Sequence, residues 1–472
     1  MKRKLFQITA AAFDSPALTK LMDFAAFISP AKVKNEAAIR ARDREAVAGG
    51  NFGSPIPRTP ANLDGTLDRD RILLGTTLFG DVPKVTERDI QLIAEGGFDF
   101  LINGNHGEYG RQIMDWCQKY NIAVIGEECG EQIGIDWHHV EDDAPSRLAA
   151  LRPHPASVGD TGWDEPTCDN FHFLADYHRA YQKALPNRFL FSNLLPGMDI
   201  KAMLGTSPYA DYVNRFSREV PTDYISADIY PFHPCKVMNR FEMIICLNTY
   251  HCLGNTCRRD NKDFWLYIQS QARWFAHLYT MTTYEMIKWQ VYASLCYGCR
   301  SIIHASYNPV WGGDAIGMIT YDGKVTEQYL YARRVNGEVQ KLSPVLKDYR
   351  SLGVTLAHAR RQNPHFTFAA LKQKHNNHLQ GFDGAPFVKS VESDSTALVG
   401  YFKNKAGQNA LMLVDCRNIY DPYTTQTVTV NFAATTRVSV YEHGEKTQEK
   451  EVTSLSLALN ACDGVFIVCQ ND

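Results

Sequence analysis

The sequence predicts a (β/α)8 barrel followed by an all-β domain, and three observations carry this prediction. Eight short apolar runs, rich in β-branched and aromatic residues, alternate with helical patterns between residues 72 and 306. The runs recur every 24 to 40 residues, which is the length of a βα unit. After about residue 352 the helical patterns stop and short alternating strands take over. A doubly wound sheet is the weaker interpretation, because the chain lacks its Gly-rich phosphate turn.

Three segments follow from this pattern. Residues 1–70 are first rich in Ala and charges and then in Pro, and we expect an extension that wraps the barrel. The barrel is expected over residues 71–352 and a small β-sandwich over residues 353–472. The eight barrel strands are expected to begin at Ile72, Phe98, Ile122, Val158, Phe189, Tyr224, Phe264 and Ser301.

Helical patterns between the strands predict helices over 87–95, 109–120, 170–185 and 283–297. Two of them begin with capping patterns, in which Thr86 precedes Asp89 and Thr282 precedes Glu285 by three residues. In the last segment, strands are expected over 397–402, 410–415, 427–432, 437–441 and 464–468.

The composition is that of a globular protein and excludes several classes of partner. The 472 residues hold 49 basic and 52 acidic side chains, a formal net charge of -3. This balance gives no reason to expect nucleic acid or an acidic membrane as partner. No stretch approaches the roughly 18 apolar residues of a spanning helix, so no membrane partner is expected.

The cysteines and the first residues indicate a reducing compartment. Twelve cysteines are irregularly spaced, which favours reduced, mostly buried thiols over a disulfide framework. The basic start resembles a signal peptide only weakly, because Gln7 and Thr9 interrupt a short apolar run that Asp14 ends. We therefore expect a cytoplasmic protein.

A barrel carries its active site at the carboxyl ends of its strands, so the residues that follow each run are the candidates. They are carboxylates, amides and aromatics, a mixture that suits carbohydrate: polar groups bind hydroxyls and aromatic faces stack on sugar rings. The expected substrate-binding residues are Asn103, His106, Glu128, Trp163, Asn193, Tyr230, Gln269, His304 and Trp311. No Schiff-base Lys or clear metal triad stands there, so a lyase or aldolase is a weaker hypothesis, and neither a metal nor an organic cofactor is expected.

Glycosidic cleavage generally needs two carboxyl groups, one to protonate the leaving oxygen and one to act as nucleophile or to activate water. Glu165 is the first candidate for the general acid/base, because Trp163 and Pro166 flank it and would desolvate it, which raises a carboxyl pKa. The competing interpretation is that Asp164, Glu165 and Pro166 only cap the following helix.

These residues carry a resemblance to a family. Residues 159–196, GDTGWDEPTCDNFHFLADYHRAYQKALPNRFLFSNLLP, resemble the fourth and fifth units of clan A (β/α)8 glycoside hydrolases, whose acid/base Glu ends strand four. Residues 289–311 and 316–346 resemble the last units of bacterial β-galactosidase-like members, which commonly carry a C-terminal β-domain. The resemblance covers about residues 72–350. It implies a hydrolase of O-glycosyl bonds with a carbohydrate substrate and Glu165 as general acid/base.

Two departures from the family leave the second carboxylate open. Clan A enzymes have Asn before the acid/base Glu, where this chain has Asp164. They place the nucleophilic Glu at the end of strand seven, where this chain has Gln269 and Gln271. A Gln side chain cannot be the nucleophile, so the second carboxylate comes from elsewhere or activity is lost.

Three residues are candidates for that role. Asp228 follows strand six; Glu128 follows strand three, where it and Glu127 cannot both point inward. Asp164 is the third, because adjacent Asp-Glu pairs after strand four resemble those of β-N-acetylhexosaminidases, in which the substrate's acetamido oxygen is the nucleophile. A non-catalytic sugar-binding barrel is the alternative from another class. The sugar, the linkage, the stereochemistry and a homo-oligomeric state stay open.

Overall fold

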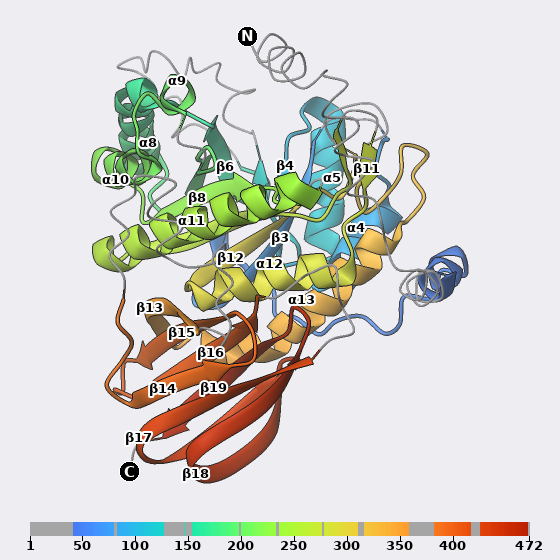
Figure 1. The fold of residues 1–472 in the computed structure, drawn as a ribbon. Coiled ribbons are helices and arrows are strands. Elements are labelled where there is room, and N and C mark those ends of the chain that lie inside the picture. The colour runs from blue at the N-terminus through green and yellow to red at the C-terminus, as the bar shows by residue number, and fades with distance from the viewer. Residues whose placement is uncertain are drawn as a thin grey trace, which may run out of the picture.

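The computed structural model describes residues 41–79, 83–126, 146, 153–197, 200–232, 236–275, 278–309, 316–357, 382–416 and 425–470. Its larger part is an eight-stranded parallel barrel with helices around it (Figure 1). The barrel strands are β3 (Leu73–Leu78), β4 (Phe100–Asn103), β5 (Ala123–Gly126), β6 (Ser157–Asp164), β7 (Phe189–Asn193), β8 (Tyr224–Ile229), β9 (Asp263–Gln269) and β12 (Cys299–Ala305). All eight expected runs form these strands, so the barrel prediction is confirmed.

The parallel strands pair in the order β7-β6-β5-β4-β3-β12-β9-β8. Between β7 and β8 the contact is a single parallel bridge from Leu194 to Ala227, supported by the Leu194 N–H on Ser226 O at 2.9 Å. The barrel is therefore nearly closed. Glycine at position 159 allows β6 to pair with β7, since a Cβ there would lie 1.9 Å from Phe189 O.

Helices follow the strands and cover the outside of the barrel (Figure 1). They are α4 (Glu87–Glu95), α5 (Gly107–Lys119), α8 (Phe171–Ala184), α9 (Lys201–Leu204), α10 (Tyr209–Glu219), α11 (Lys236–Asp260), α12 (Tyr284–Cys296) and α13 (Glu327–Leu346), with a 3-10 turn at Cys168–Asn170. A short hairpin, β10 (Arg273–Phe275) and β11 (Leu278–Thr280), follows β9. Within the described residues no helix is long and apolar enough to cross a membrane.

The two expected helix caps differ in outcome. At the start of α4 the Asp89 carboxylate accepts the Thr86 backbone N–H at 2.7 Å, as the capping pattern predicted. The prediction for Thr282 was wrong by one residue. Thr283 is the N-cap of α12 and accepts the Met286 N–H, whereas Thr282 donates its hydroxyl to Ser270 O.

Side chains fill the barrel interior, and at its amino-terminal end they are largely aromatic. Phe189 stacks on Trp265 with ring centroids 4.8 Å apart and lies 4.6 Å from the Tyr224 ring. One layer further along, Phe191 lies between Tyr224 and Tyr267. Large rings fill a barrel tightly, so this end is a packed core and polar groups are left for the carboxyl-terminal end.

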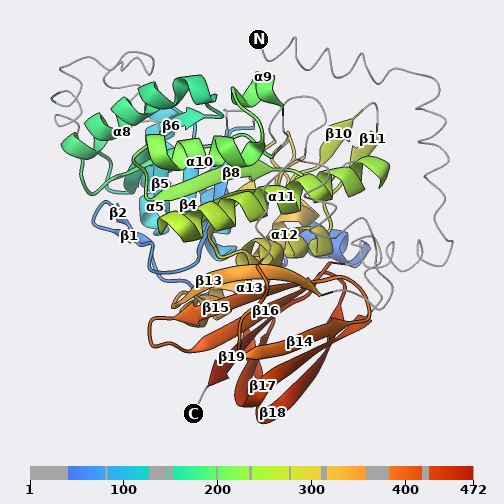
Figure 2. The same ribbon diagram turned by 60° about the vertical axis from the view of Figure 1, so that its left-hand side comes forward.

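The C-terminal part is an antiparallel β-structure that lies against the barrel beneath α12 and α13 (Figures 1 and 2). Its strands are β13 (Tyr349–Ala357), β14 (Val388–Ser393), β15 (Ala397–Asn404), β16 (Asn409–Asp415), β17 (Thr425–Glu442), β18 (Glu445–Asn460) and β19 (Gly464–Gln470). The strands expected over 427–432 and 437–441 are one long strand, β17, so their separation was wrong. β17 pairs β14 with its first half and β19 with its second, which folds the sheet around one apolar core.

A buried ion pair joins the two parts. Lys288 of α12 donates its ammonium group to Asp463, which lies between β18 and β19, and both side chains are buried. On α13, the Glu338 carboxylate accepts hydrogen bonds from the Tyr284 and Tyr292 hydroxyls at 2.6 Å each. These contacts fix α12 between the barrel and the β-domain.

Of the described residues before β3, the first contact α13, whereas Asn62 donates to Pro155 O just before β6. Residues 41–48 are helical, and β1 (Asn62–Leu63) pairs with β2 (Thr66–Leu67) in a small hairpin. Arg333 of α13 donates to Phe52 O, and Arg334 pairs with Asp43 at 2.8 Å.

Candidate active site

Four neighbouring strands bring candidate residues together at the carboxyl-terminal mouth of the barrel. Going around it, β6, β7, β8 and β9 follow one another, and they end at Asp164, Asn193, Ile229 and Gln269. Asp164 pairs directly with Asn193 across β6 and β7. The side chains at these strand ends are therefore neighbours in the mouth.

Glu165 follows β6 with a backbone conformation that is rare for a side-chain-bearing residue. Its φ is +52°, in the left-handed region, and its N–H donates to Asn193 O at 2.8 Å. Such a conformation costs about 1–3 kcal/mol and persists only where the surroundings impose it. The Tyr212 hydroxyl from α10 donates to the carbonyl of the next residue, Pro166, which helps to hold this turn.

Asp228 lies on β8, on the same face as Tyr224 and Ser226. Its Oδ1 accepts a hydrogen bond from Asn193 Nδ2 at 3.2 Å, and the Ser226 hydroxyl donates to Asn193 Oδ1 at 2.9 Å. Burial raises the pKa of the Asp228 carboxyl well above its usual range, and the charges of Glu165 and Asp164 raise it further. Three carboxyl groups therefore share one electrostatic environment, in which at least one is driven to hold a proton.

Two tyrosines stand beside these carboxyl groups. Burial and then the charges of Asp228 and other neighbours raise the pKa of the Tyr230 phenol. The pKa of Tyr267 on β9 is raised by burial and by Asp164 and Asp228. Both phenols therefore stay protonated and can donate to an oxygen in the mouth.

Gln269 ends β9, and its side chain already forms hydrogen bonds within the chain. It is fully buried; its Oε1 accepts the Phe232 N–H at 2.8 Å and its Nε2 donates to Phe232 O at 3.1 Å. Gln290 of α12 binds the Gln269 backbone N–H and carbonyl in the same way. In this arrangement Gln269 holds the β8–α11 connection, and its assignment as a sugar ligand stays a prediction.

The remaining candidates are more scattered. His304 on β12 is fully buried, with Nδ1 2.7 Å from Ser270 Oγ and its ring edge-on to Phe98, and burial lowers its pKa to about 3. Its neighbours Ile303 and Ala305 face the barrel interior, so His304 faces outward. Asn103 is buried and accepts from Asn105 in the turn after β4. The structure does not bring these two to the carboxyl cluster.

Two candidates lie near the turns, and two cannot be placed. His106 is exposed and precedes α5 as its N-cap residue. Trp163 is half-buried and packs against the apolar cluster outside the barrel. Glu128 and Trp311 lie outside the described residues.

The sequence interpretation missed Tyr267 and Ser226. The alternation of side chains along a strand could have predicted both. Tyr267 is two residues before Gln269, Ser226 is two residues before Asp228, and side chains two residues apart share a face. Tyr212 carried no such signal, since it reaches the site from a helix.

In the described part of the chain, no three His, Cys, Asp or Glu side chains are arranged so that they could hold a metal ion. Ten cysteines fall within the described residues, and all are buried and without a disulfide. Burial raises the pKa of Cys296 and of Cys257, so these thiols are not activated as nucleophiles.

Comparison with known proteins places the fold among glycoside hydrolases of known structure. A catalytic mutant of Gan42B, a GH42 β-galactosidase from G. stearothermophilus, superposes with a TM-score of 0.52 over 87% of this chain and 100% of that one, at 8% identity. A β-galactosidase from Bacillus circulans sp. alkalophilus gives 0.52 over 86% and 100%, also at 8% identity. The chain shares their fold. At this identity the likeness concerns the fold alone.

A β-galactosidase from the psychrophilic Marinomonas ef1 matches with a TM-score of 0.43 and 11% identity, over 57% of this chain. The match spans 60% of the length of that enzyme. No protein-family model and no curated protein sequence matches the chain.

Proposed function

We propose that this protein is a glycoside hydrolase in which Glu165 and Asp228 form the catalytic carboxyl pair. The observation that carries the proposal is their common environment at the ends of β6 and β8, where burial, and then the charge of Glu165, raise the pKa of Asp228. A pair of carboxyl groups that shares one proton supplies both the acid and the base that glycosidic cleavage requires.

The two groups differ in setting, and this assigns their roles. Glu165 is partly exposed after β6, where it can approach the oxygen of a departing group, and we assign it as general acid/base. Asp228 is held by Asn193 on β8. In the reactive state the proton that the pair shares is on Glu165, and the ionised Asp228 carboxylate acts on the sugar, directly or through water. Tyr230 and Tyr267 are placed to donate to sugar oxygens. With such a pair, catalysis does not need a Glu at the end of β9.

A substrate-assisted β-N-acetylhexosaminidase is the second candidate. Asp164 contributes to the raised pKa values of Asp228, Tyr230 and Tyr267, so its charge acts in the same mouth. In that chemistry the acetamido oxygen of the substrate attacks, Asp164 orients it and Glu165 protonates the leaving oxygen.

The test is a panel of aryl galactosides, glucosides, arabinosides and N-acetylhexosaminides, assayed with the wild-type chain and with Glu165→Gln. Cleavage that the substitution lowers by about 10²–10⁴-fold supports the hydrolase. Activity confined to N-acetyl substrates selects the Asp164 mechanism. Glu451→Gln on β18, exposed and remote from the mouth, is the matched control and should keep full activity.

If the wild-type chain cleaves none of the panel substrates but binds oligosaccharides saturably, the result would contradict the assignment as a hydrolase and support a non-catalytic sugar-binding barrel instead. In that case Glu165→Gln would leave binding unchanged.

A further inference from the structure

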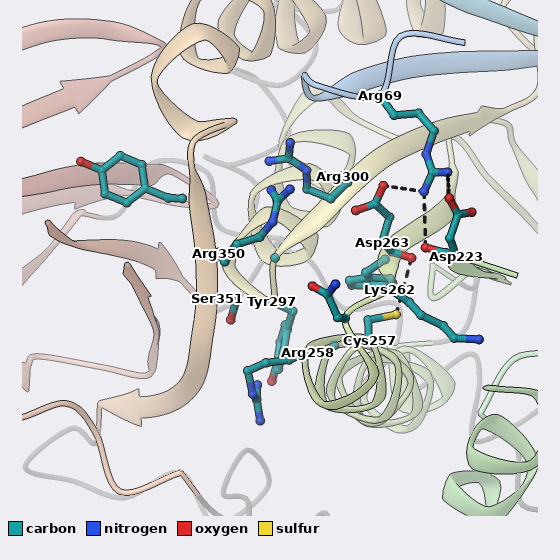
Figure 3. Close-up of a pocket in the computed structure, with 15 residues that line it drawn as sticks. Arg69, Asp223, Cys257, Arg258, Lys262, Asp263, Tyr297, Arg300, Arg350 and Ser351 are labelled. Atoms are coloured by element: carbon teal, nitrogen blue, oxygen red, sulfur yellow. Dashed lines mark hydrogen bonds and ion pairs between the residues drawn. The ribbon is translucent and has the colours of Figure 1, made fainter. Parts of the chain in front are cut away.

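A cavity of about 520 Å³ lies at the amino-terminal end of the barrel, opposite the candidate active site. Asp223 stands just before β8, Asp263 begins β9 and Arg300 lies at the start of β12. The β-domain closes the cavity with Tyr349, Arg350 and Ser351 of β13 (Figure 3). Its volume is in the range of small-molecule sites, and its walls come from both parts of the chain.

Basic side chains outnumber acidic ones around this cavity. The described lining residues include five basic side chains, Arg69, Arg258, Lys262, Arg300 and Arg350, and two acidic ones, Asp223 and Asp263. Both acids are bound by one base, because Arg69 pairs with Asp223 at 2.5 Å and with Asp263 at 2.6 Å. The remaining four positive charges are not matched by acids of the lining, which attracts an anion.

Arg300 and Arg350 are the centre of this charge. Figure 3 shows their guanidinium groups side by side, and both donate through Nη1 to the same oxygen, Lys347 O, at 2.9 and 3.3 Å. Lys347 is the C-cap residue of α13, so the helix end partly offsets the two charges. The Lys347 carbonyl, however, binds only the Nη1 group of each guanidinium.

The other donors of Arg300 have no counterpart in the described part of the chain. Arg300 is only 6% exposed, and its buried Nε and Nη2 find no acceptor there. The buried Ser351 hydroxyl on the same wall also has no hydrogen-bond partner in the described part of the chain. Burial and the nearby Arg350 charge lower the pKa of Arg300 to about 10. A buried, unsatisfied guanidinium beside a second one is costly unless an anion accepts its hydrogen bonds.

We propose that this cavity binds a phosphate group, free or carried by a small metabolite, between Arg300 and Arg350. Planar guanidinium forks present paired N–H donors that match the oxygens of a tetrahedral oxyanion. The doubly charged phosphate neutralises the excess of basic groups better than a single carboxylate does. The site does not depend on the activity proposed for the barrel mouth.

The test is isothermal titration calorimetry of the full chain at constant ionic strength, with inorganic phosphate and with glycerol phosphate as separate titrants. Saturable binding of one phosphate per chain is expected. Tighter binding of glycerol phosphate selects a metabolite as the source, and tighter binding of inorganic phosphate selects the free ion. Arg350→Gln should weaken either by about tenfold or more, the scale of one charge-assisted hydrogen bond.

Arg350 is exposed, so its replacement leaves the core intact, and the thermal unfolding curve of Arg350→Gln checks its fold. Arg179→Gln on α8 removes an exposed Arg far from the cavity and should bind as the wild type does. As a second measurement, phosphate should raise the Tm of the wild-type chain above its value in chloride at equal ionic strength. Absence of saturable binding in the wild type, or equal affinity in Arg350→Gln, would overturn the proposal.

Discussion

Asn193 on β7 donates a hydrogen bond from Nδ2 to Oδ1 of Asp228 on β8 at 3.2 Å. This contact crosses the one seam of the barrel that a single backbone bridge holds, between Leu194 and Ala227. The backbone carbonyl of Asn193 also accepts the N–H of Glu165. One residue thus contacts both members of the proposed carboxyl pair and sets their relative position.

Replacing Asp228 by Asn is expected to stabilise the fold while activity is lost. Burial raises the pKa of the carboxyl, so the folded protein binds that proton more tightly than the unfolded chain does, and stability falls as pH rises from the ordinary Asp pKa toward the raised one. The neutral amide escapes this loss. We expect about 0.5–2 kcal/mol of added stability at pH 8 and less at pH 5, measured by thermal unfolding. A gain independent of pH would contradict a raised pKa.

Replacing Gln269 by Glu, which places a carboxyl group at the end of β9, is not expected to increase activity. Oε1 and Nε2 of Gln269 bind the N–H and the carbonyl of Phe232, and a carboxylate would set two acceptors against each other in a buried site. We expect a loss of about 1–3 kcal/mol in the free energy of unfolding by denaturant titration. Gln118→Glu, on the exposed face of α5, is the control and should change stability little. A variant with higher glycosidase activity and unchanged stability would show that Gln269 is free to serve catalysis.

Removing one partner of the Lys288–Asp463 pair is expected to loosen the β-domain from the barrel. Both side chains are buried, so Lys288→Met leaves a carboxylate without its counter-ion. Loss of one member of such a pair costs roughly 3–5 kcal/mol, and replacing both members recovers part of it. A double-mutant cycle with Asp463→Leu, followed by denaturant unfolding, measures the coupling. Additive single effects would show that the pair does not act as a unit.

Much of the fold could be predicted from the sequence because barrel strands are short, buried and regularly spaced. All eight runs appeared as strands, and the capping pattern at Thr86 gave the start of α4. The split of β17 was wrong because Ala433 to Thr436 interrupts the alternation, while the strand continues across an irregularity in its pairing with β18 between Asn431 and Thr436. Such pairing is a long-range property that a local pattern does not contain.

The site was predictable in part. Glu165 and Asp228 followed from their positions after strands, since strand ends meet at the barrel mouth. The outward direction of His304 depends on the phase of β12, which a run of apolar residues on both faces does not reveal. The hydrogen bond from the Phe232 N–H to the Gln269 side chain depends on the path of a loop, which the local sequence pattern does not reveal.

The most direct measurement is the rate at which Glu165→Gln cleaves two aryl glycosides of the same sugar, one with a dinitrophenyl and one with a phenyl leaving group. Without its general acid, the variant should lose about 10²–10⁴-fold on the phenyl glycoside, which needs protonation of the departing oxygen. It should lose far less in the bond-breaking step with the dinitrophenyl glycoside, which leaves without a proton. Equal losses on both substrates, or none on either, would contradict the assignment of Glu165.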